Sequence, residues 1–335
     1  MAQAAGRNFH VQPDQAQQTL AALLRVWLAG KSWKDVERLI HTRHVLVNGN
    51  LCLDKGRRLA AKEVVKVLEH PTAPLAKAED IKVRYLDAHL VVVEKPSGMT
   101  SNRHAEELTW SAKRKQLQST LDELLPRVID RMDNPRTKSR PASRSPQHKG
   151  VPPPVRPVHR LDRETSGLMV FARTRAAERH LGQQFRDHST HRVYLAIVPG
   201  AVQAQTIRSQ LIRDRGDGRR GSTTQPAVGK PAVTHIKPIE QLAGYTLIEC
   251  RLETGRTHQI RIHLADLGHP LCGEKVYHQP LFGEPRVDRS GAPRIALHAA
   301  ELGFVHPVSG ETVRYKMPLP PDLAIFLARL RQSAT

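Results

Sequence analysis

The stretch that most constrains this chain is residues 158–174, where a dense polar segment leads directly into an apolar run. Asp162 stands between Arg160 and Arg163, and a Thr-Ser-Gly sequence typical of a tight turn follows. Residues 168–172 have the length and composition of a buried strand. Because a strand fixes the loop beside it, folds often place catalytic groups in such loops. Two interpretations are open here: a catalytic acid, or an ordinary surface ion pair.

The sequence carries a large positive charge. Its 335 residues contain 52 Lys and Arg against 32 Asp and Glu, a formal net charge of +20. Such an excess predicts a polyanionic partner, nucleic acid before an anionic membrane. Aromatic residues make up only 4% of the chain, so phosphate contacts are expected to contribute more than base stacking. No apolar run approaches the roughly 18 residues of a membrane-spanning helix, and no secretory signal is evident. We expect a cytoplasmic protein without membrane contact.

The cysteines and histidines do not indicate a metal site. The three cysteines are scattered and odd in number, which predicts neither a disulfide framework nor a zinc site. His258, His263 and His269 are five and six residues apart, a poor spacing for ligands on one helix. Gly229-Lys230 is followed by Pro231 where a phosphate-binding loop needs Ser or Thr. We expect no metal and no cofactor.

The N-terminal part predicts a small α/β module. Residues 20–28 and 36–40 show apolar side chains at helical spacing, residues 45–49 end in the Asn-Gly of a hairpin, and a strand follows. This order resembles the S4-type RNA-binding domain, here residues 17–70. In that family the second helix and the next loop contact RNA. The resemblance therefore implies RNA contacts at Lys31, Lys34, Arg38, Arg43 and His44. The alternative is a module with a solvated charged face.

Residues 78–330 predict a second, larger domain. Strands dominate between residues 80 and 315, but the regular strand–helix alternation of a parallel fold is missing. The pattern therefore predicts an α+β fold with a mixed, largely antiparallel central sheet and flanking helices. Residues 133–157 are rich in Pro, Ser, Arg and Lys without periodicity, which predicts a flexible basic insertion.

Four segments, residues 95–99, 159–168, 252–263 and 294–307, occur in one order. Together they resemble the motifs of the RluA-type family of RNA pseudouridine synthases. The resemblance implies the pseudouridine synthase fold and the conversion of uridine to pseudouridine without a redox step or a metal. An RNA-binding module before such a domain resembles the branch that modifies large-subunit ribosomal RNA. We expect ribosomal RNA as the substrate, with transfer RNA as the alternative, and a monomer.

The resemblance also implies roles for single residues. Asp162 matches the catalytic nucleophile, which attacks either the sugar or the ring. Arg261 matches the arginine that pairs with this acid and favours its ionised form. Arg160 matches the residue that enters the RNA helix where the target base leaves. Tyr194 matches the tyrosine that stacks on the base and is a candidate to help remove the C5 proton. The alternative for Tyr194 is a core aromatic residue.

The sequence departs from the family pattern at several positions. Arg192 stands where a lysine is usual, and Glu274 follows Gly273 where the family has Asp. His278 stands where a glycine often follows Tyr277. None of these departures removes a predicted catalytic group, although they bear on the identity of the substrate. Two other function classes are compatible with the residues: a non-catalytic RNA-binding or ribosome-assembly protein, and a hydrolytic N-glycosidase that leaves an abasic site.

Overall fold

The computed structural model of the chain describes residues 7–69, 71–72, 74–103, 107–110, 112–133, 153–216, 219–225, 227–278 and 287–332. Contacts divide the chain into two compact units. The first unit contains Met1–Pro74, Tyr194–Leu297 and Leu319–Thr335, and the second contains Leu75–Val193 and His298–Pro318. The predicted domain limits, 17–70 and 78–330, stay a prediction.

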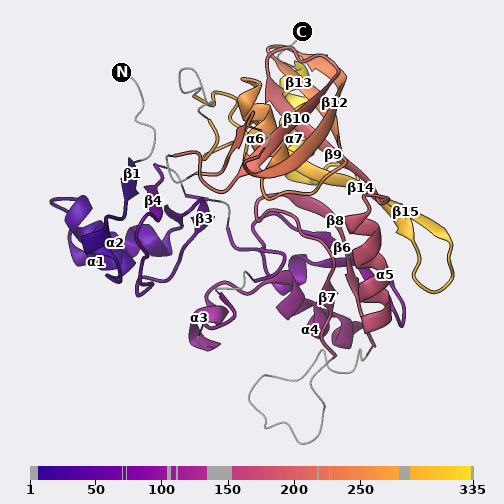
Figure 1. Cartoon of the computed structure of the whole chain (residues 1–335), viewed down its shortest axis with the longest axis horizontal. Coiled ribbons are helices and arrows are strands. Elements are labelled where there is room, and N and C mark those ends of the chain that lie inside the picture. The colour runs from indigo at the N-terminus through magenta and orange to yellow at the C-terminus, as the bar shows by residue number, and fades with distance from the viewer. Residues whose placement is uncertain are drawn as a thin grey trace, which may run out of the picture. The chain divides into compact units, whose positions relative to one another are not determined.

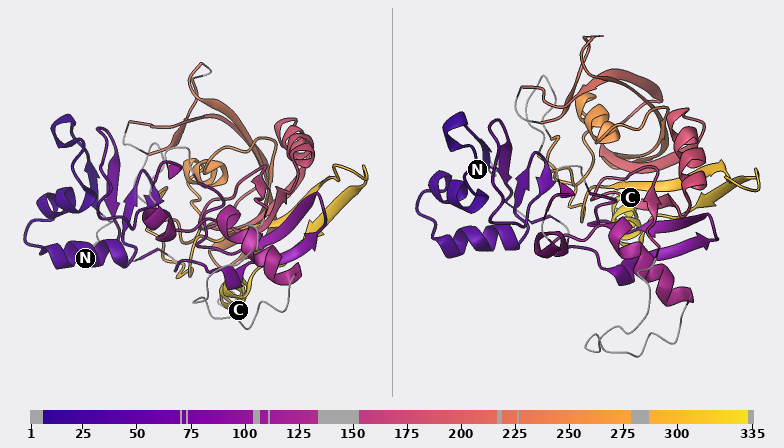
Figure 2. Two further views of the ribbon diagram at one scale, coloured as in Figure 1. Left: turned by 90° about the horizontal axis from the view of Figure 1, so that it is seen from below. Right: turned by 60° about the horizontal axis from the view of Figure 1, so that its bottom comes forward.

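An N-terminal module, residues 7–72, opens the first unit. Four strands form an antiparallel sheet in the order β1 (Arg7–His10), β4 (Val64–Val67), β2 (Val45–Val47) and β3 (Asn50–Leu51). Both helices, α1 (Leu20–Trp27) and α2 (Trp33–His41), pack against the side of this sheet that carries Val45, Val47 and Val65 (Figure 2). A 3-10 turn (Pro13–Gln15) precedes them.

Local sequence signals explain where the module's elements begin and turn. The Thr19 hydroxyl accepts a hydrogen bond from the Ala22 N–H and so caps α1. Ser32 and Asp35 form a capping box at the start of α2. The hairpin between β2 and β3 turns at Asn48 and Gly49, whose φ angles of 50° and 78° are those of the predicted tight turn.

The rest of the first unit contains a group of mainly antiparallel strands. Its order is β11 (Gly221–Thr223), β10 (Gln205–Ile212), β12 (Lys230–Leu242), β13 (Tyr245–Leu252) and β9 (His191–Pro199), the last of which begins in the second unit. Two helices complete it, α6 (Gln259–Asp266) and α7 (Pro321–Gln332). The apolar face of α7 packs with Leu242 and Leu247 in one core cluster.

In the second unit the strand order is β14 (Leu297–Val305), β8 (Ser166–Ala172), β6 (Leu90–Lys95) and β5 (Lys82–Leu86), with β15 (Thr312–Lys316) beside β14 and β7 (Arg156–Pro157) beside β8. Its helical segments are a 3-10 turn (Ala78–Asp80), α3 (Ala112–Gln116), α4 (Leu121–Asp133) and α5 (Arg175–Arg186). Helix α5 covers β6 and β8 (Figure 1). Strand β8 is parallel to β14 and antiparallel to β6.

These strands confirm the predicted α+β class with a mixed, largely antiparallel sheet. The predicted insertion is partly wrong at its end, because Arg156 and Pro157 pair with β8 at Ala172 and Phe171. Residues 134–152 of that insertion lie outside the described part of the chain.

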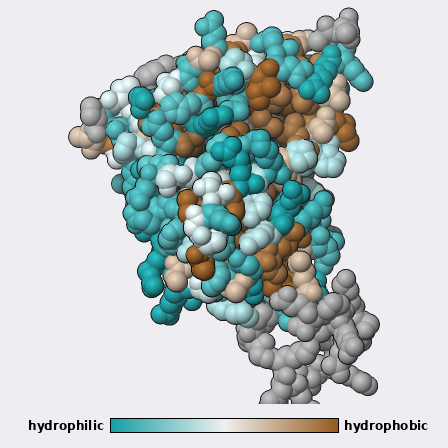
Figure 3. Space-filling model, turned by 90° about the vertical axis from the view of Figure 1, so that its right-hand side faces the viewer, coloured by the Kyte–Doolittle hydropathy of each residue, from teal (hydrophilic) through white to brown (hydrophobic). Residues whose placement is uncertain are grey.

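All three cysteines, Cys52, Cys250 and Cys272, are buried, and none of them forms a disulfide. Burial raises the pKa of Cys250 and of Cys272 to about 12, so both thiols stay protonated at neutral pH. The face drawn in Figure 3 is mainly hydrophilic, with apolar side chains exposed in smaller areas between the polar ones. Within the described residues, no helix combines the length and the apolar character needed to cross a membrane.

Candidate active site

The predicted polar loop lies in the second unit, immediately before β8. Asp162 is partly exposed, and its carbonyl oxygen accepts a hydrogen bond from the Thr165 N–H at 3.1 Å, which closes a turn centred on Arg163 and Glu164. The turn predicted at residues 165–167 is therefore wrong in its position, because Ser166 and Gly167 already belong to β8. Arg163 forms an ion pair with Glu164, an acid for which no role was predicted. The buried strand β8 begins at Ser166, directly after the loop. This rigid element therefore fixes the main chain at the C-terminal end of the loop.

Lys95 fastens the loop from the end of β6. Its side chain is completely buried, and its nitrogen donates hydrogen bonds to the carbonyl oxygens of Pro96 (3.0 Å), Met99 (2.7 Å) and Arg163 (3.1 Å). The Gly98 N–H also donates to the Arg163 carbonyl, at 2.8 Å. A buried ammonium needs such acceptors, because an unpaired charge is costly away from water. The Lys-Pro-x-Gly turn therefore holds the main chain directly after Asp162.

Two serines of the same turn hold the loop on either side of Asp162. The Ser101 hydroxyl donates to the Leu161 carbonyl at 2.7 Å and accepts from the Leu161 N–H at 3.0 Å. The Ser97 hydroxyl donates to the Glu164 carbonyl at 2.7 Å. We call residues 95–101 the loop clamp. All of these contacts to the loop are to main-chain atoms, so the loop clamp fixes the backbone on both sides of Asp162.

The start of β8 requires a glycine. Gly167 has a φ of 130°, and a Cβ atom there would lie 2.3 Å from the carbonyl oxygen of Ala299. Strands β8 and β14 also meet at the preceding residue, where the Ser166 hydroxyl lies 3.0 Å from Nδ1 of His298. The glycine therefore lets the Asp162 loop continue into a strand that is closely packed against its neighbour.

His159 anchors the beginning of the loop by stacking. Its ring lies on Phe185, with 4.4 Å between ring centroids, and its Nε2 accepts a hydrogen bond from the Val170 N–H at 3.0 Å. The guanidinium carbon of Arg192 lies 5.7 Å from the centre of the Phe185 ring. Burial, together with the charge of Arg192, lowers the pKa of His159 to about 3. His159 is therefore neutral and acts as an acceptor.

Arg261, in the first unit, lies on α6 after a turn that Gln259 organises. The Gln259 side-chain oxygen accepts from the Thr254 hydroxyl (2.8 Å) and the Arg256 N–H (3.0 Å), and its nitrogen donates to the Val233 carbonyl (3.0 Å). Two turns of helix follow. The Thr-Gly-Arg-Thr-His-Gln segment is thus a rigid entry into the helix that carries the arginine.

Glu274 holds the Arg261 guanidinium. Nε and one terminal nitrogen of Arg261 donate to the two Glu274 oxygens, each at 2.8 Å, and the two side chains are only 7% and 1% exposed. Burial would raise the pKa of Glu274, but the charge and hydrogen bonds of Arg261 and backbone N–H groups hold it at about 2. Tyr277 lies beneath, its ring centre 5.1 Å from the guanidinium carbon.

The remaining predicted residues are distributed as follows. Tyr194 lies in β9 and is 8% exposed. Tyr194 and Arg261 belong to the first unit, while Arg160 and Asp162 lie on one loop of the second. The roles predicted for these four residues stay predictions.

The five residues predicted to contact RNA in the N-terminal module differ in their surroundings. Lys31 and Lys34 are exposed, and Arg38 is exposed but forms an ion pair with Asp35 at 2.9 Å. Arg43 is partly buried, and its Nε donates to the Thr72 carbonyl at 3.1 Å.

His44 is also partly buried, and its Nδ1 lies 2.9 Å from the Thr42 hydroxyl. Arg43 and His44 therefore also make contacts inside the module. Trp33, whose spacing predicts a place on the apolar face of α2, is 54% exposed.

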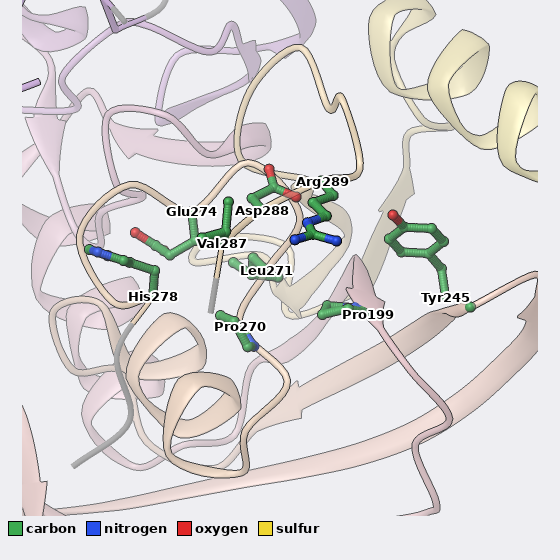
Figure 4. A pocket seen from close by; sticks show the side chains of 10 residues that line it. Pro199, Tyr245, Pro270, Leu271, Glu274, His278, Val287, Asp288 and Arg289 are labelled. Atoms are coloured by element: carbon green, nitrogen blue, oxygen red, sulfur yellow. The ribbon is translucent and has the colours of Figure 1, made fainter. Parts of the chain in front are cut away.

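A cavity of about 220 Å³ lies in the first unit near Glu274. Tyr245 and Asp288 line it with His278, one of the departures from the family pattern (Figure 4). Burial and the charges of Lys66 and Arg219 lower the pKa of His278 to about 4, which makes its ring neutral. Among the described residues no group of His, Cys, Asp and Glu side chains could hold a metal ion.

Comparison with known proteins identifies the family. The model of a family described as RNA pseudouridylate synthase matches residues 89–266, more than half of the chain. The chain belongs to the RNA pseudouridylate synthase family. The matched region of this pseudouridine synthase contains the loop clamp, the Asp162 loop and Arg261. RNA is therefore its substrate, and its reaction is the isomerisation of uridine.

Individual relatives of this pseudouridine synthase carry names of the same family. It is 34% identical over 299 residues to the "Ribosomal large subunit pseudouridine synthase D" of Neisseria meningitidis, covering 87% of this chain and 72% of the relative. An uncharacterized RNA pseudouridine synthase of Bacillus subtilis is 33% identical over 305 residues, 89% of each chain. Among solved structures, human RNA Pseudouridylate Synthase Domain Containing 1 superposes with a TM-score of 0.53 and 25% identity, covering 78% of this chain and 97% of that one.

Proposed function

We propose that this pseudouridine synthase acts on large-subunit ribosomal RNA in the cytoplasm and uses Asp162 as its nucleophile, without a metal or cofactor. The observation that carries the role of Asp162 is the loop clamp: main-chain contacts fix the residues on both sides of a partly exposed carboxylate. A fixed carboxylate is a suitable covalent catalyst because it is both a nucleophile and an acceptable leaving group. The name of the Neisseria relative, a ribosomal large subunit pseudouridine synthase, supports the choice of RNA.

The proposed reaction needs no co-reactant, because the product contains the same atoms as the substrate. The Asp162 carboxylate forms a covalent bond to C1′ of the ribose or to the pyrimidine ring, and the N1–C1′ bond breaks. After the base rotates, a C5–C1′ bond forms and the carboxylate is released. C5 loses a proton and N1 gains one, so the product is an isomer of the substrate. In this scheme Tyr194 stacks on the base and helps remove the C5 proton, while the charge of Arg261 favours an ionised carboxylate.

Reaching the uridine requires that it leave the base stack, because its reacting atoms are inaccessible inside an RNA helix. Arg160, two residues before Asp162 on the same loop, is proposed to enter the helix at that position. We further propose that residues 17–70 are an S4-type RNA-binding domain of a monomeric enzyme. The exposed side chains of Lys31, Lys34 and Arg38, with Arg43 and His44, would contact phosphates.

The first experiment is pseudouridine mapping of ribosomal and transfer RNA from cells with and without this protein. We expect loss of pseudouridine from large-subunit ribosomal RNA. Loss from transfer RNA alone would contradict the proposed substrate.

The second experiment measures tritium release from large-subunit ribosomal RNA labelled at uridine C5. We expect Asp162→Asn to abolish release, while Glu164→Gln, the same charge change on the same loop, retains most of it. Release unchanged in Asp162→Asn would exclude this residue as the nucleophile. No release from any cellular RNA would favour a non-catalytic RNA-binding protein, and free uracil among the products would identify an N-glycosidase.

A further inference from the structure

The segment of residues 274–277, which we call the anchor segment, curls around the carboxylate that holds Arg261. One oxygen of Glu274 accepts hydrogen bonds from the backbone N–H groups of Lys275 (3.0 Å), Val276 (2.8 Å) and Tyr277 (3.2 Å), besides the one from Arg261. The Tyr277 hydroxyl lies 2.6 Å from Nδ1 of His258, directly before α6. The position of the guanidinium therefore depends on the conformation of this segment.

The N-terminal module fastens the anchor segment by polar contacts. The Lys66 side-chain nitrogen, from β4, donates to the carbonyl oxygen of Lys275 at 2.8 Å. In return, the Lys275 side-chain nitrogen donates to the carbonyl oxygen of Pro71 at 2.8 Å. Lys66 is only 6% exposed, so its ammonium is directed inward and is not available to RNA. Its carbonyl partner belongs to the residue next to Glu274.

Apolar packing supports the same contact. Residues of the module alternate between two sides: Val45 and Val47 pack with α1 and α2, whereas Leu46 packs in a different cluster. That second cluster joins the module to α6 and the anchor segment. Its members are Leu46, Leu51, Leu53, Leu68, Leu211, Ala232, Ile262, Ala265, Val276 and Tyr277. The helix that carries Arg261 and the segment that holds it thus share one core with the module.

We propose that Lys66 of the N-terminal module is a positioning residue for Arg261, acting through the Lys275 carbonyl and Glu274. The proposal rests on the catalytic role proposed for Arg261. It gives the N-terminal module a second task besides binding RNA, because the module would also fix a catalytic side chain of the larger domain. Loss of the Lys66 contact would loosen the anchor segment and let the guanidinium move, and small displacements of a catalytic group are costly in rate.

Charge supports this assignment. Burial and the charge of Arg219 lower the pKa of Lys66 to about 8, while the charge of Glu274 raises it. The attraction between Lys66 and Glu274 therefore adds to the hydrogen bond at the Lys275 carbonyl and draws the module toward the anchor segment.

The test compares Lys66→Met with Lys62→Met, an exposed lysine of the same module that loses the same charge. The probe is a large-subunit ribosomal RNA transcript labelled at uridine C5, and the readouts are the single-turnover rate at saturating RNA and the Kd for that RNA. We expect Lys66→Met to lower the saturated rate about tenfold, as loss of a charged hydrogen bond predicts. Its Kd should match that of Lys62→Met, because Lys66 does not face RNA.

Further variants separate positioning from folding. Glu274→Asp keeps the charge but shortens the arm that holds Arg261, and it should also lower the saturated rate. The double variant Lys66→Met/Glu274→Asp should be no slower than the slower single variant, within about threefold, because both act through one segment. Thermal unfolding midpoints verify that every variant is folded at the assay temperature.

The saturated rates of these variants test the positioning role of Lys66. Equal saturated rates for Lys66→Met and Lys62→Met would overturn the inference, as would fully multiplicative effects in the double variant. Arg261→Lys, which loses the bidentate geometry, keeps these failures distinct from failure of the proposed function. A wild-type rate in Arg261→Lys would overturn the proposed role of Arg261 and the inference with it. A slow Arg261→Lys beside a normal Lys66→Met would overturn the inference alone.

Discussion

The side-chain nitrogen of Lys95 lies 3.1 Å from the carbonyl oxygen of Arg163, the residue that follows Asp162. We therefore expect Lys95→Met to remove a hydrogen-bond donor from the carbonyl oxygens of Pro96, Met99 and Arg163, the last of which keeps the Gly98 N–H, and to lower the free energy of unfolding by about 3 kcal/mol or more. Activity should fall even at temperatures where the variant is folded, because the loop is no longer fixed. Urea unfolding and tritium release measure both effects. Lys82→Met, at an exposed position of β5, should change neither.

Gly167→Ala should disrupt the start of β8. Its Cβ atom would meet main-chain atoms of Ala299, which cannot move without displacing β14, and its φ of 130° disfavours any side chain. We expect a loss of roughly 3 kcal/mol or more in the free energy of unfolding. The control is Gly310→Ala, where φ is 73° but no atom lies within 4 Å of the added Cβ. A cost as small as that of the control, about 1 kcal/mol, would show that β14 yields at Ala299.

His159 should make the protein less stable in mild acid. Its pKa is about 3 in the folded chain, against an ordinary value of 6.5. As the pH falls from about 6.5 toward 3, the unfolded state binds a proton that the folded state does not, so the free energy of unfolding falls by about 1.4 kcal/mol per pH unit. His159→Gln, whose side-chain oxygen can still accept from the Val170 N–H, should reduce this slope by about one proton.

Urea unfolding at pH 7, 6 and 5 measures the slope. His188→Gln, at an exposed histidine, is the matched control and should leave it close to that of the wild type. An unchanged slope in His159→Gln would mean that His159 binds its proton equally in both states.

Reversing the charge of Lys34 should weaken RNA binding and make it less dependent on salt. Each phosphate contact releases counterions, so Lys34→Glu should reduce the slope of log K against log salt concentration by about one. Filter binding with a large-subunit ribosomal RNA transcript at several salt concentrations gives this slope. Lys62→Glu makes the same change of charge elsewhere on the module. If both variants had the same slope, the predicted RNA contact at α2 would be wrong.

Elements fixed by short-range patterns were predictable from the sequence. The caps at Thr19 and Ser32, the turn at Asn48-Gly49 and the strand after the Asp162 loop depend on residues within a few positions of one another. The α+β class followed from the same local signals, because strand and helix periods differ. The polar loop before β8 was likewise visible as a change from polar to apolar residues.

Contacts between distant segments were not predictable in this way. Glu274 appeared in the sequence only as a departure from the family pattern, since nothing local indicates that it meets Arg261 across thirteen positions. The Arg43 side chain donates to a carbonyl 29 residues further on. Trp33 follows the helical spacing of α2 but is the first residue of that helix, so it lies beyond the buried turns around Val36 and Ile40.

The loop clamp has a consequence for how this enzyme can change. Ser97, Ser101 and Lys95 contact only carbonyl and amide groups of the Asp162 loop, which every amino acid except proline supplies. The side chains at Arg160 and Arg163 can therefore be exchanged while the main chain that presents the carboxylate keeps its course. We therefore expect directed evolution at Arg160, the residue proposed to enter the RNA helix, to change the target uridine without changing the contacts of the loop clamp.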